Sequence, residues 1–179
     1  MAPSKIMIIR HGEKPVKEGS SNGVTCDGET DADSLIVRGW QRAGALCGLF
    51  SGATGGLAPP LARPNQLFAA GRNDAHHSRR PKQTLDPLAL ALNLSIDDSF
   101  PPGAEQSLAK KLLQVTGVVL IAWEHSAIKE LVRAVTNGGV QAPNWPNRFD
   151  MIYCLDPTPW RLTQRPQMLL AGDCDVLFT

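Results

Sequence analysis

The side chains best suited to chemistry are two histidines and two arginines, which occur in three short polar segments. Arg10 and His11 follow a short apolar run, Arg80 ends a basic segment, and His125 follows a second apolar run. Arginine stays charged at biological pH and grips phosphate oxygens with parallel hydrogen bonds. A neutral imidazole attacks phosphorus, and a second imidazole donates a hydrogen bond to the phosphoryl oxygens. These residue types indicate a site for a phosphoryl dianion, neutralised by fixed cations without a metal.

Other residues in the same segments extend this candidate site. Gly12 has no side chain, so backbone N–H groups have room to approach a phosphate there. A helix expected after His125 directs its N-terminal amides at the same anion. The remaining polar neighbours are candidate substrate contacts: Glu13, His76, Arg79, Glu124 and Ser126.

The pattern of apolar residues predicts the elements that position these segments. Short continuous apolar runs predict buried strands at 5–9, 66–70 and 117–123, and two more strands are expected at 151–155 and 167–170. Helical spacing predicts helices at 35–50, 81–92, 105–113 and 126–136. Ser34 is the expected N-cap of the first helix and Gly52 its stop. Gly, Pro and polar residues predict loops at 17–33, 51–64 and 143–147.

Strands that alternate with helices predict an α/β fold, a three-layer α/β/α sandwich with a mainly parallel central sheet. The length of 179 residues suits a single domain, 1–179. Ligands bind such sheets beyond the carboxyl ends of the strands. We therefore expect the three polar segments to meet at that edge.

Composition excludes several other classes of protein. The 18 basic and 17 acidic side chains give a net charge of +1, which argues against a nucleic-acid or membrane-surface binder. No apolar stretch approaches the roughly 18 to 20 residues that cross a bilayer, and no signal peptide is recognisable, so we expect a cytoplasmic protein. The four cysteines form no CxxC pair, which favours reduced thiols over a zinc site.

The three segments, in this order, resemble the motifs of the histidine phosphatase superfamily, also called phosphoglycerate-mutase-like. Arg10-His11-Gly12-Glu13 resembles its RHG motif, and Arg80-Pro-Lys-Gln83-Thr84 resembles its second motif. His125 resembles its second catalytic histidine, and the stretch 33–43 resembles the helix entry between the first two motifs. The resemblance covers nearly the whole chain.

The resemblance implies roles for individual residues. His11 would be the nucleophile that becomes phosphohistidine, Arg10 and Arg80 would hold the phosphate, and His125 would complete the pocket. It implies a metal-independent phosphatase with no cofactor. The implied partners are a phosphorylated small molecule or phosphoprotein as substrate, and inorganic phosphate.

Three positions depart from the usual family motifs. His76 stands where a small polar residue is usual, Pro81 where alanine is common, and Ser126 where glycine or aspartate is common. None of these changes removes a phosphate ligand. They place the chain in a divergent branch.

The general acid must be a carboxylic acid close to the phosphate. In the mutase-like branch of the family a glutamate lies between the second and third motifs, and Glu105 occupies a comparable stretch. We favour Glu105 for this role, with Glu124 and Glu13 as alternatives. Glu124 is adjacent to His125, but alternation along the strand favours a side chain turned away from the pocket.

Two other functions remain open at this stage. A phosphoglycerate-type phosphomutase is disfavoured because the chain is short and lacks the Gly-x-Trp-Glu-Gly stretch typical of mutases. A catalytically silent phosphate-binding protein is the second alternative, although such proteins usually lose one of the four central residues. If His11 is the nucleophile, we expect the rate to fall between about pH 7 and pH 4, unless nearby carboxylates shift its pKa.

Overall fold

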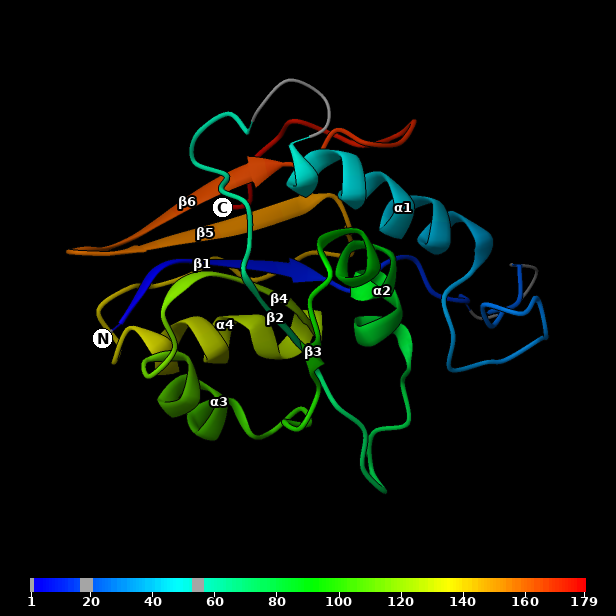
Figure 1. Cartoon of the computed structure of the whole chain (residues 1–179), viewed down its shortest axis with the longest axis horizontal. Coiled ribbons are helices and arrows are strands. Elements are labelled where there is room, and N and C mark those ends of the chain that lie inside the picture. Colours follow the sequence, from blue (N-terminus) through cyan, green and yellow to red (C-terminus); the bar gives the residue numbers. More distant parts are fainter. Residues whose placement is uncertain (1, 17–20, 53–56) are drawn as a thin grey trace.

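A six-stranded sheet lies between two pairs of helices in the computed structural model, which describes residues 2–16, 21–52 and 57–179 (Figure 1). The elements in chain order are β1 (Pro3–Arg10), α1 (Val37–Ser51), β2 (Gln66–Ala69), α2 (Arg80–Leu92), β3 (Ile96–Asp97), α3 (Glu105–Leu112), β4 (Gly117–Trp123), α4 (His125–Val135), β5 (Met151–Pro157) and β6 (Trp160–Pro166). Within these described residues, none of the helices combines the length and apolarity that crossing a membrane requires. The predicted α/β class is confirmed.

The strand order places the central polar segments at one edge of the sheet. The order is β3-β2-β4-β1-β5-β6, in which β3, β2, β4 and β1 are parallel and β5 and β6 are antiparallel to their neighbours. Arg10 pairs with Trp123, and Ala69 pairs with Ala122. The carboxyl ends of β1, β2 and β4 therefore lie side by side, as the sequence predicted.

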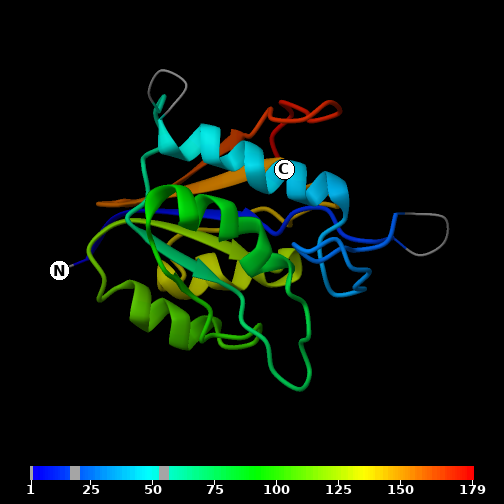
Figure 2. The same cartoon turned by 45° about the vertical axis from the view of Figure 1, so that its right-hand side comes forward.

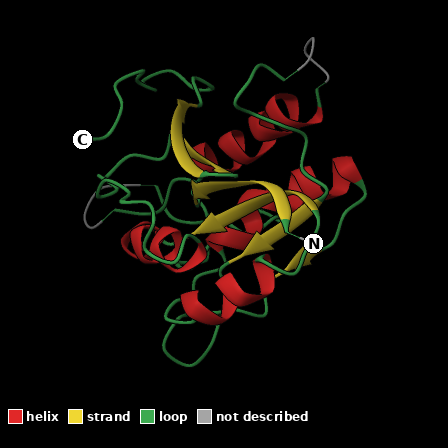
Figure 3. Cartoon of the chain, turned by 90° about the vertical axis from the view of Figure 1, so that its left-hand side faces the viewer, coloured by secondary structure: helices red, strands yellow, loops and turns green. Residues whose placement is uncertain are grey.

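Alternate residues of β1 and β4 belong to two separate hydrophobic cores. Figure 3 shows helices on both faces of the sheet. Ile6 and Ile8 pack with α3 and α4, whereas Met7 and Ile9 pack with α1 and α2. On α4 the buried residues recur at helical spacing: Ile128, Leu131, Val132 and Val135. Figure 2 shows α1 and α2 neighbouring each other over one face, with α3 and α4 over the opposite face. This arrangement is the predicted three-layer sandwich.

The last strand was predicted at the wrong place. The structure has β6 at Trp160–Pro166, paired with β5 as an antiparallel hairpin, and residues 167–170 form no strand. The apolar residues at 167–170 suggested a buried strand, but Met168 among them is 57% exposed. The short strand β3 was not predicted, since two residues carry too little pattern to be recognised.

Helix boundaries differ from the prediction by a few residues. Ser34 is not the N-cap of α1, because its hydroxyl donates to Asp31 and accepts from Gln83 instead, and α1 begins at Val37. Gly52 ends α1 in the left-handed conformation, with φ of 75°, as expected. Parts of the predicted loops 17–33 and 51–64, namely 17–20 and 53–56, lie outside the described residues. All four cysteines are free.

Candidate functional site

The ends of β1 and β4 hold the two histidines beside each other. The backbone N–H of His11 donates to the carbonyl of Trp123 at 3.2 Å, which extends the strand pairing by one residue. Glu124 and His125 follow Trp123 directly, with Glu124 as the N-cap residue of α4. Arg80 reaches the same edge from the first residue of α2.

His11 is buried in its neutral form, with a defined tautomer. Its ring is 2% exposed, and Nδ1 lies 2.7 Å from the carbonyl oxygen of Gly12. Because a carbonyl only accepts hydrogen bonds, Nδ1 carries the proton and Nε2 keeps its lone pair. Burial is the main cause that lowers the pKa of His11 to about 3; the hydrogen bond to Gly12 opposes this change, and the charges of Arg10 and Arg80 add to it. Burial and the neighbouring cations thus favour a neutral His11 between pH 7 and pH 4, so the structure replaces the loss of rate expected from the sequence with the expectation of no acid limb from this group.

Arg10 is held from the opposite side by the loop before β5. Its Nη1 donates to Asn147 Oδ1 at 3.1 Å and to the carbonyl of Arg148 at 3.2 Å. Its guanidinium carbon lies 3.9 Å from the centre of the Phe149 ring, a cation–π contact. Burial lowers the pKa of Arg10 to about 10, while the charge of Glu124 opposes this change. The guanidinium remains charged at neutral pH in a fixed orientation.

Several buried polar atoms of the site have no hydrogen-bond partner within the described residues. They are Nε of Arg10, Nε and Nη1 of Arg80, and Nδ1 of His125, with the Ser78 hydroxyl nearby in sequence. Leaving a buried polar group unsatisfied costs about 1–3 kcal/mol, and more for a charged group. Such a convergence of unpaired N–H groups fits an oxyanion as ligand. This agrees with the phosphoryl chemistry that the sequence predicts.

Burial and neighbouring cations also act on His125. They lower its pKa, with burial as the main cause and Arg10 and Lys14 as further causes. His125 is therefore neutral near pH 7 and has one ring N–H to donate. That proton suits a hydrogen bond to a bound oxyanion.

Lys14 is a site cation that the sequence prediction left out. Burial lowers its pKa, and so do the charges of Arg10 and Arg80, whereas Glu124 raises it. These interactions place the Lys14 ammonium in the same electrostatic neighbourhood. Its position three residues after His11, in the first motif, was the available clue.

Gly12 has a different purpose from the predicted one. Its backbone N–H is occupied by Thr84 Oγ1, at 2.8 Å. A Cβ at Gly12 would lie 3.0 Å from the carbonyl oxygen of Gly39, so the missing side chain allows α1 to pack against this loop. Thr84 in turn donates to the carbonyl of Arg80 at 2.7 Å. The second motif therefore ties the His11 loop to the helix that carries Arg80.

Glu13 is engaged inside the protein instead of facing a substrate. Its carboxylate accepts hydrogen bonds from Arg42 at 2.8 and 3.1 Å and forms an ion pair with Arg38 at 3.3 Å. Burial disfavours the charge of Arg42, but hydrogen bonds to Asp173 and Glu13 raise its pKa overall. The structure thus gives Glu13 a role in anchoring the first motif. This argues against the two roles considered for Glu13 from the sequence, a substrate contact and the general acid.

Of Glu105 and Glu124, only Glu124 shifts the pKa values of the cationic residues at the site. Glu105 accepts hydrogen bonds from the Trp123 indole at 3.1 Å and from the Gly103 backbone at 3.0 Å, and it is buried. It is not among the causes that shift the pKa values of Arg10, His11, Lys14, Arg80 or His125. The charge of Glu124 raises the pKa values of three of them, namely Arg10, Lys14 and Arg80. This favours Glu124 over Glu105 as the carboxyl group near the phosphate.

The remaining candidates lie at the rim. Arg79 is exposed and forms an ion pair with Asp31 at 3.3 Å. His76 is half-buried, and its backbone pairs with Asn73 in an isolated bridge. Ser126 is exposed in the first turn of α4.

Solved structures with this architecture include histidine phosphatases. A protein from Agrobacterium tumefaciens, assigned as the phosphohistidine phosphatase SixA, is 16% identical with a TM-score of 0.53, covering 90% of this chain and 96% of that one. The protein histidine phosphatase SixA in complex with tungstate is 16% identical with a TM-score of 0.52, covering 91% and 97%. No protein-family model and no curated protein sequence matches the chain. The chain therefore has the phosphoglycerate-mutase-like fold.

The unpaired donors predict that an oxyanion binds and stabilises the folded protein. Vanadate or inorganic phosphate should raise the melting temperature in proportion to the logarithm of its concentration. Arg80→Gln should weaken binding about tenfold or more, because it removes charge-assisted hydrogen bonds. Arg161→Gln, an exposed change on β6, is the matched control. Differential scanning fluorimetry measures the melting temperatures. An equal rise in melting temperature for wild-type protein, Arg80→Gln and Arg161→Gln would contradict the assigned site.

Proposed function

We propose that the chain is a metal-independent phosphatase that hydrolyses a phosphomonoester through a phosphohistidine on His11. The observation that carries this proposal is the cluster of unpaired donors on Arg10, Arg80 and His125 beside a buried, neutral His11. The fold shared with histidine phosphatases supports it. The arrangement supplies a nucleophile and three donors to the phosphoryl oxygens, which are the parts that phosphoryl transfer needs.

In the first step, Nε2 of His11 attacks phosphorus and the ester P–O bond breaks. Nδ1 stays hydrogen-bonded to the Gly12 carbonyl, which fixes the ring and stabilises the charge that develops on the imidazole. Arg10 and Arg80 bind the equatorial oxygens, and His125 donates a further hydrogen bond. In the complex with the phosphoryl dianion, Glu124 carries the proton that the departing oxygen takes; in the free protein Glu124 is the carboxylate whose charge acts on the arginines.

In the second step, water attacks the phosphohistidine and the P–N bond breaks. The Glu124 carboxylate, left ionised by the first step, accepts the proton of the attacking water. Inorganic phosphate is released and His11 returns to its neutral form. The same carboxyl group thus donates a proton and takes one back, so each turnover restores the starting state.

Hydrolysis is favoured over transfer to a second acceptor by features of the chain itself. The Gly-x-Trp-Glu-Gly stretch typical of mutases is missing from the sequence. A phosphomutase must keep water out while its phosphohistidine waits for the second hydroxyl group. Glu124 and His125 are only half-buried, so water can reach the site.

Turnover of a generic aryl phosphate tests this proposal. Wild-type protein should hydrolyse it in excess EDTA, and His11→Ala should lower kcat by roughly a thousandfold or more because the nucleophile is lost. His77→Ala removes an exposed histidine and is the matched control, with activity close to wild type. Activity that disappears with EDTA, or persists in His11→Ala, would contradict the mechanism. Oxyanion binding without turnover would favour the silent phosphate-binding alternative.

The pH dependence of kcat/KM tests the electrostatics of His11. Because burial and nearby cations disfavour the imidazolium, the lowered pKa of about 3 keeps His11 neutral throughout the range from about pH 4 to pH 7. We expect no acid limb from this group above pH 4, once the profile is corrected for ionisation of the substrate. Circular dichroism at each pH verifies that the protein stays folded. A half-maximal loss near pH 6.5, carried by a protonated His11 in an NMR titration, would show that the site does not depress its pKa.

A further inference from the structure

The Arg10 guanidinium has one edge that the protein occupies and one edge that it leaves free. Nη1 donates to Asn147 Oδ1 at 3.1 Å and to the carbonyl of Arg148 at 3.2 Å, both on the loop before β5. Nε is buried without a partner, and Nη2 forms no hydrogen bond either within the described residues. Nε and Nη2 form the edge of the planar group that can bind an oxyanion through two parallel hydrogen bonds. The loop before β5 therefore determines which edge of Arg10 is left for the phosphoryl group.

The ring of Phe149 supports the plane of this guanidinium. The central carbon of the guanidinium lies over the ring, 3.9 Å from its centroid. Two hydrogen bonds through Nη1 alone leave the group free to rotate about that nitrogen, whereas contact with a ring face restricts this rotation. The same ring lies 6.0 Å from the His11 ring, tilted by 54°. One half-buried side chain thus borders both the nucleophile and the cation beside it.

Phe149 is itself held by a buried glutamine that also binds the first motif's partner. Nε2 of Gln167 donates to the carbonyl of Phe149 at 3.0 Å. Oε1 of Gln167 accepts from Arg42 Nη1 at 2.8 Å, and Arg42 in turn binds Glu13 at 2.8 Å. Glu13 lies three residues after Arg10. A closed series of contacts therefore fixes the Phe149 ring relative to the segment that carries Arg10.

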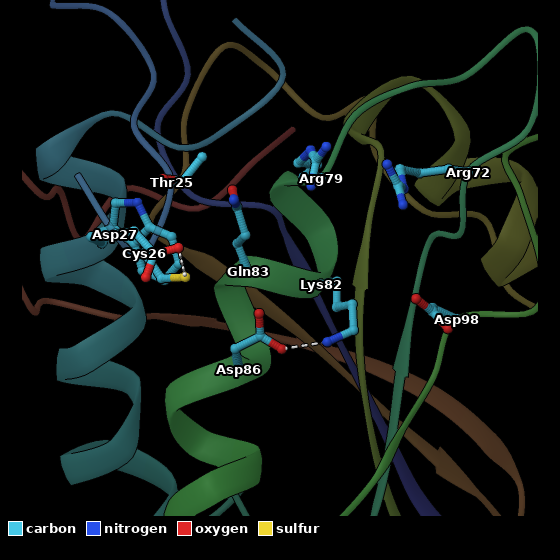
Figure 4. A pocket seen from close by; sticks show the side chains of 10 residues that line it. Thr25, Cys26, Asp27, Arg72, Arg79, Lys82, Gln83, Asp86 and Asp98 are labelled. Carbon is cyan, nitrogen blue, oxygen red and sulfur yellow. Dashed lines mark hydrogen bonds and ion pairs between the residues drawn. The ribbon is translucent and has the colours of Figure 1, made fainter. Parts of the chain in front are cut away.

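The side of the site formed by α2 gives Arg10 no comparable support. A cavity of about 400 Å³ lies along α2, and Figure 4 shows the side chains that line it. Its charged lining residues, among those that the structure describes, are three cations and three carboxylates: Arg72, Arg79, Lys82, Asp27, Asp86 and Asp98. None of them forms a described hydrogen bond with Arg10 or is among the causes that shift its pKa. The orientation of Arg10 therefore depends on the loop before β5.

We propose that Phe149 is a positioning residue for phosphoryl transfer, whose ring holds the Arg10 guanidinium so that its Nε–Nη2 edge points at the phosphoryl oxygens. The inference rests on the proposed function and adds to it a residue outside the three motifs. A cation held in place in advance does not have to reorganise when charge develops on the phosphoryl group. The role requires an aromatic face, because an aliphatic side chain lacks the quadrupole that attracts a cation.

A double-mutant cycle between Phe149 and Arg10 tests this role. Phe149→Leu should lower kcat/KM for phenyl phosphate about tenfold, mainly through kcat, because Arg10 loses its fixed orientation. Phe149→Tyr keeps the ring face and should retain most of the activity. In the Arg10→Gln background, Phe149→Leu should cause little further loss, because no guanidinium remains to be positioned. Phe100→Leu, which removes a half-buried ring packed against the core under α3 and α4, is the matched control.

The same cycle can be measured without turnover, as the affinity for vanadate in titration calorimetry. Phe149→Leu should weaken vanadate binding about tenfold in the wild-type background and hardly at all in Arg10→Gln. Melting temperatures, compared with that of Phe100→Leu, separate this effect from a loss of stability. Phe149→Met, a second variant without a ring, replaces Phe149→Leu if the latter does not fold.

Equal losses from Phe149→Leu in the wild-type and Arg10→Gln backgrounds overturn the inference, because Phe149 then does not act through Arg10. A Phe149→Leu protein as active as Phe100→Leu, or a Phe149→Tyr protein as impaired as Phe149→Leu, also overturns it. Hydrolysis that depends on His11 but shows no coupling between Phe149 and Arg10 would leave the proposed function intact and remove this inference alone. Coupling in vanadate affinity without any hydrolysis would remove the proposed function and keep the role of Phe149 in orienting Arg10.

Discussion

The burial of like charges around His11 is the constraint on which the rest of the structure depends. Arg10 is buried and Arg80 is half-buried at one edge of the sheet, and each carries buried N–H groups that no described residue satisfies. Burial lowers the pKa of both groups, and Glu124 is the main charge that opposes this effect. An oxyanion bound between them would supply the missing hydrogen-bond acceptors and a compensating negative charge. Burial, together with the charges of Arg10 and Arg80, keeps His11 neutral, which is the state in which imidazole is a nucleophile.

The protein holds this unfavourable cluster in place with interactions at its periphery. Arg148 forms an ion pair with Asp150 at 2.9 Å and donates to the carbonyl of Val176 at 2.7 Å. These contacts anchor the loop before β5, which accepts the hydrogen bonds of Arg10. Arg42 bridges Glu13 and Asp173, with 2.8 Å to each carboxylate. The C-terminal segment thereby stabilises both the first motif and the loop opposite it. Fixed donors of this kind do not have to reorganise when charge develops during a reaction.

The sequence was sufficient to predict the layers and the meeting of the three motifs. Continuous apolar runs such as 5–9 and 117–123 are long enough to identify buried strands, and the polar residues that follow them must share one edge. The sequence could not predict β6 correctly, because the half-buried side chains of an edge hairpin alternate only weakly. Its position therefore became clear only from its pairing with β5.

Contacts between distant residues were equally hidden. Asn147 lies 137 residues from Arg10, and Arg42 lies 29 residues from Glu13, so no local pattern links either pair. The environments of the three glutamates depend on contacts of the same kind. The resemblance favoured Glu105 as the general acid, whereas in the fold Glu105 accepts a hydrogen bond from the Trp123 indole and the charge of Glu124 acts on Arg80.

Direct detection of the phosphorylated enzyme tests the central claim most directly. The protein would be mixed with a radiolabelled aryl phosphate, quenched in alkali during turnover, and digested for peptide mass spectrometry. The mechanism predicts a phosphoryl group on His11 that survives alkali, is lost in acid, and is absent from His11→Ala. Turnover by wild-type protein with no label on His11, or with a phosphoryl group on another side chain, would contradict it.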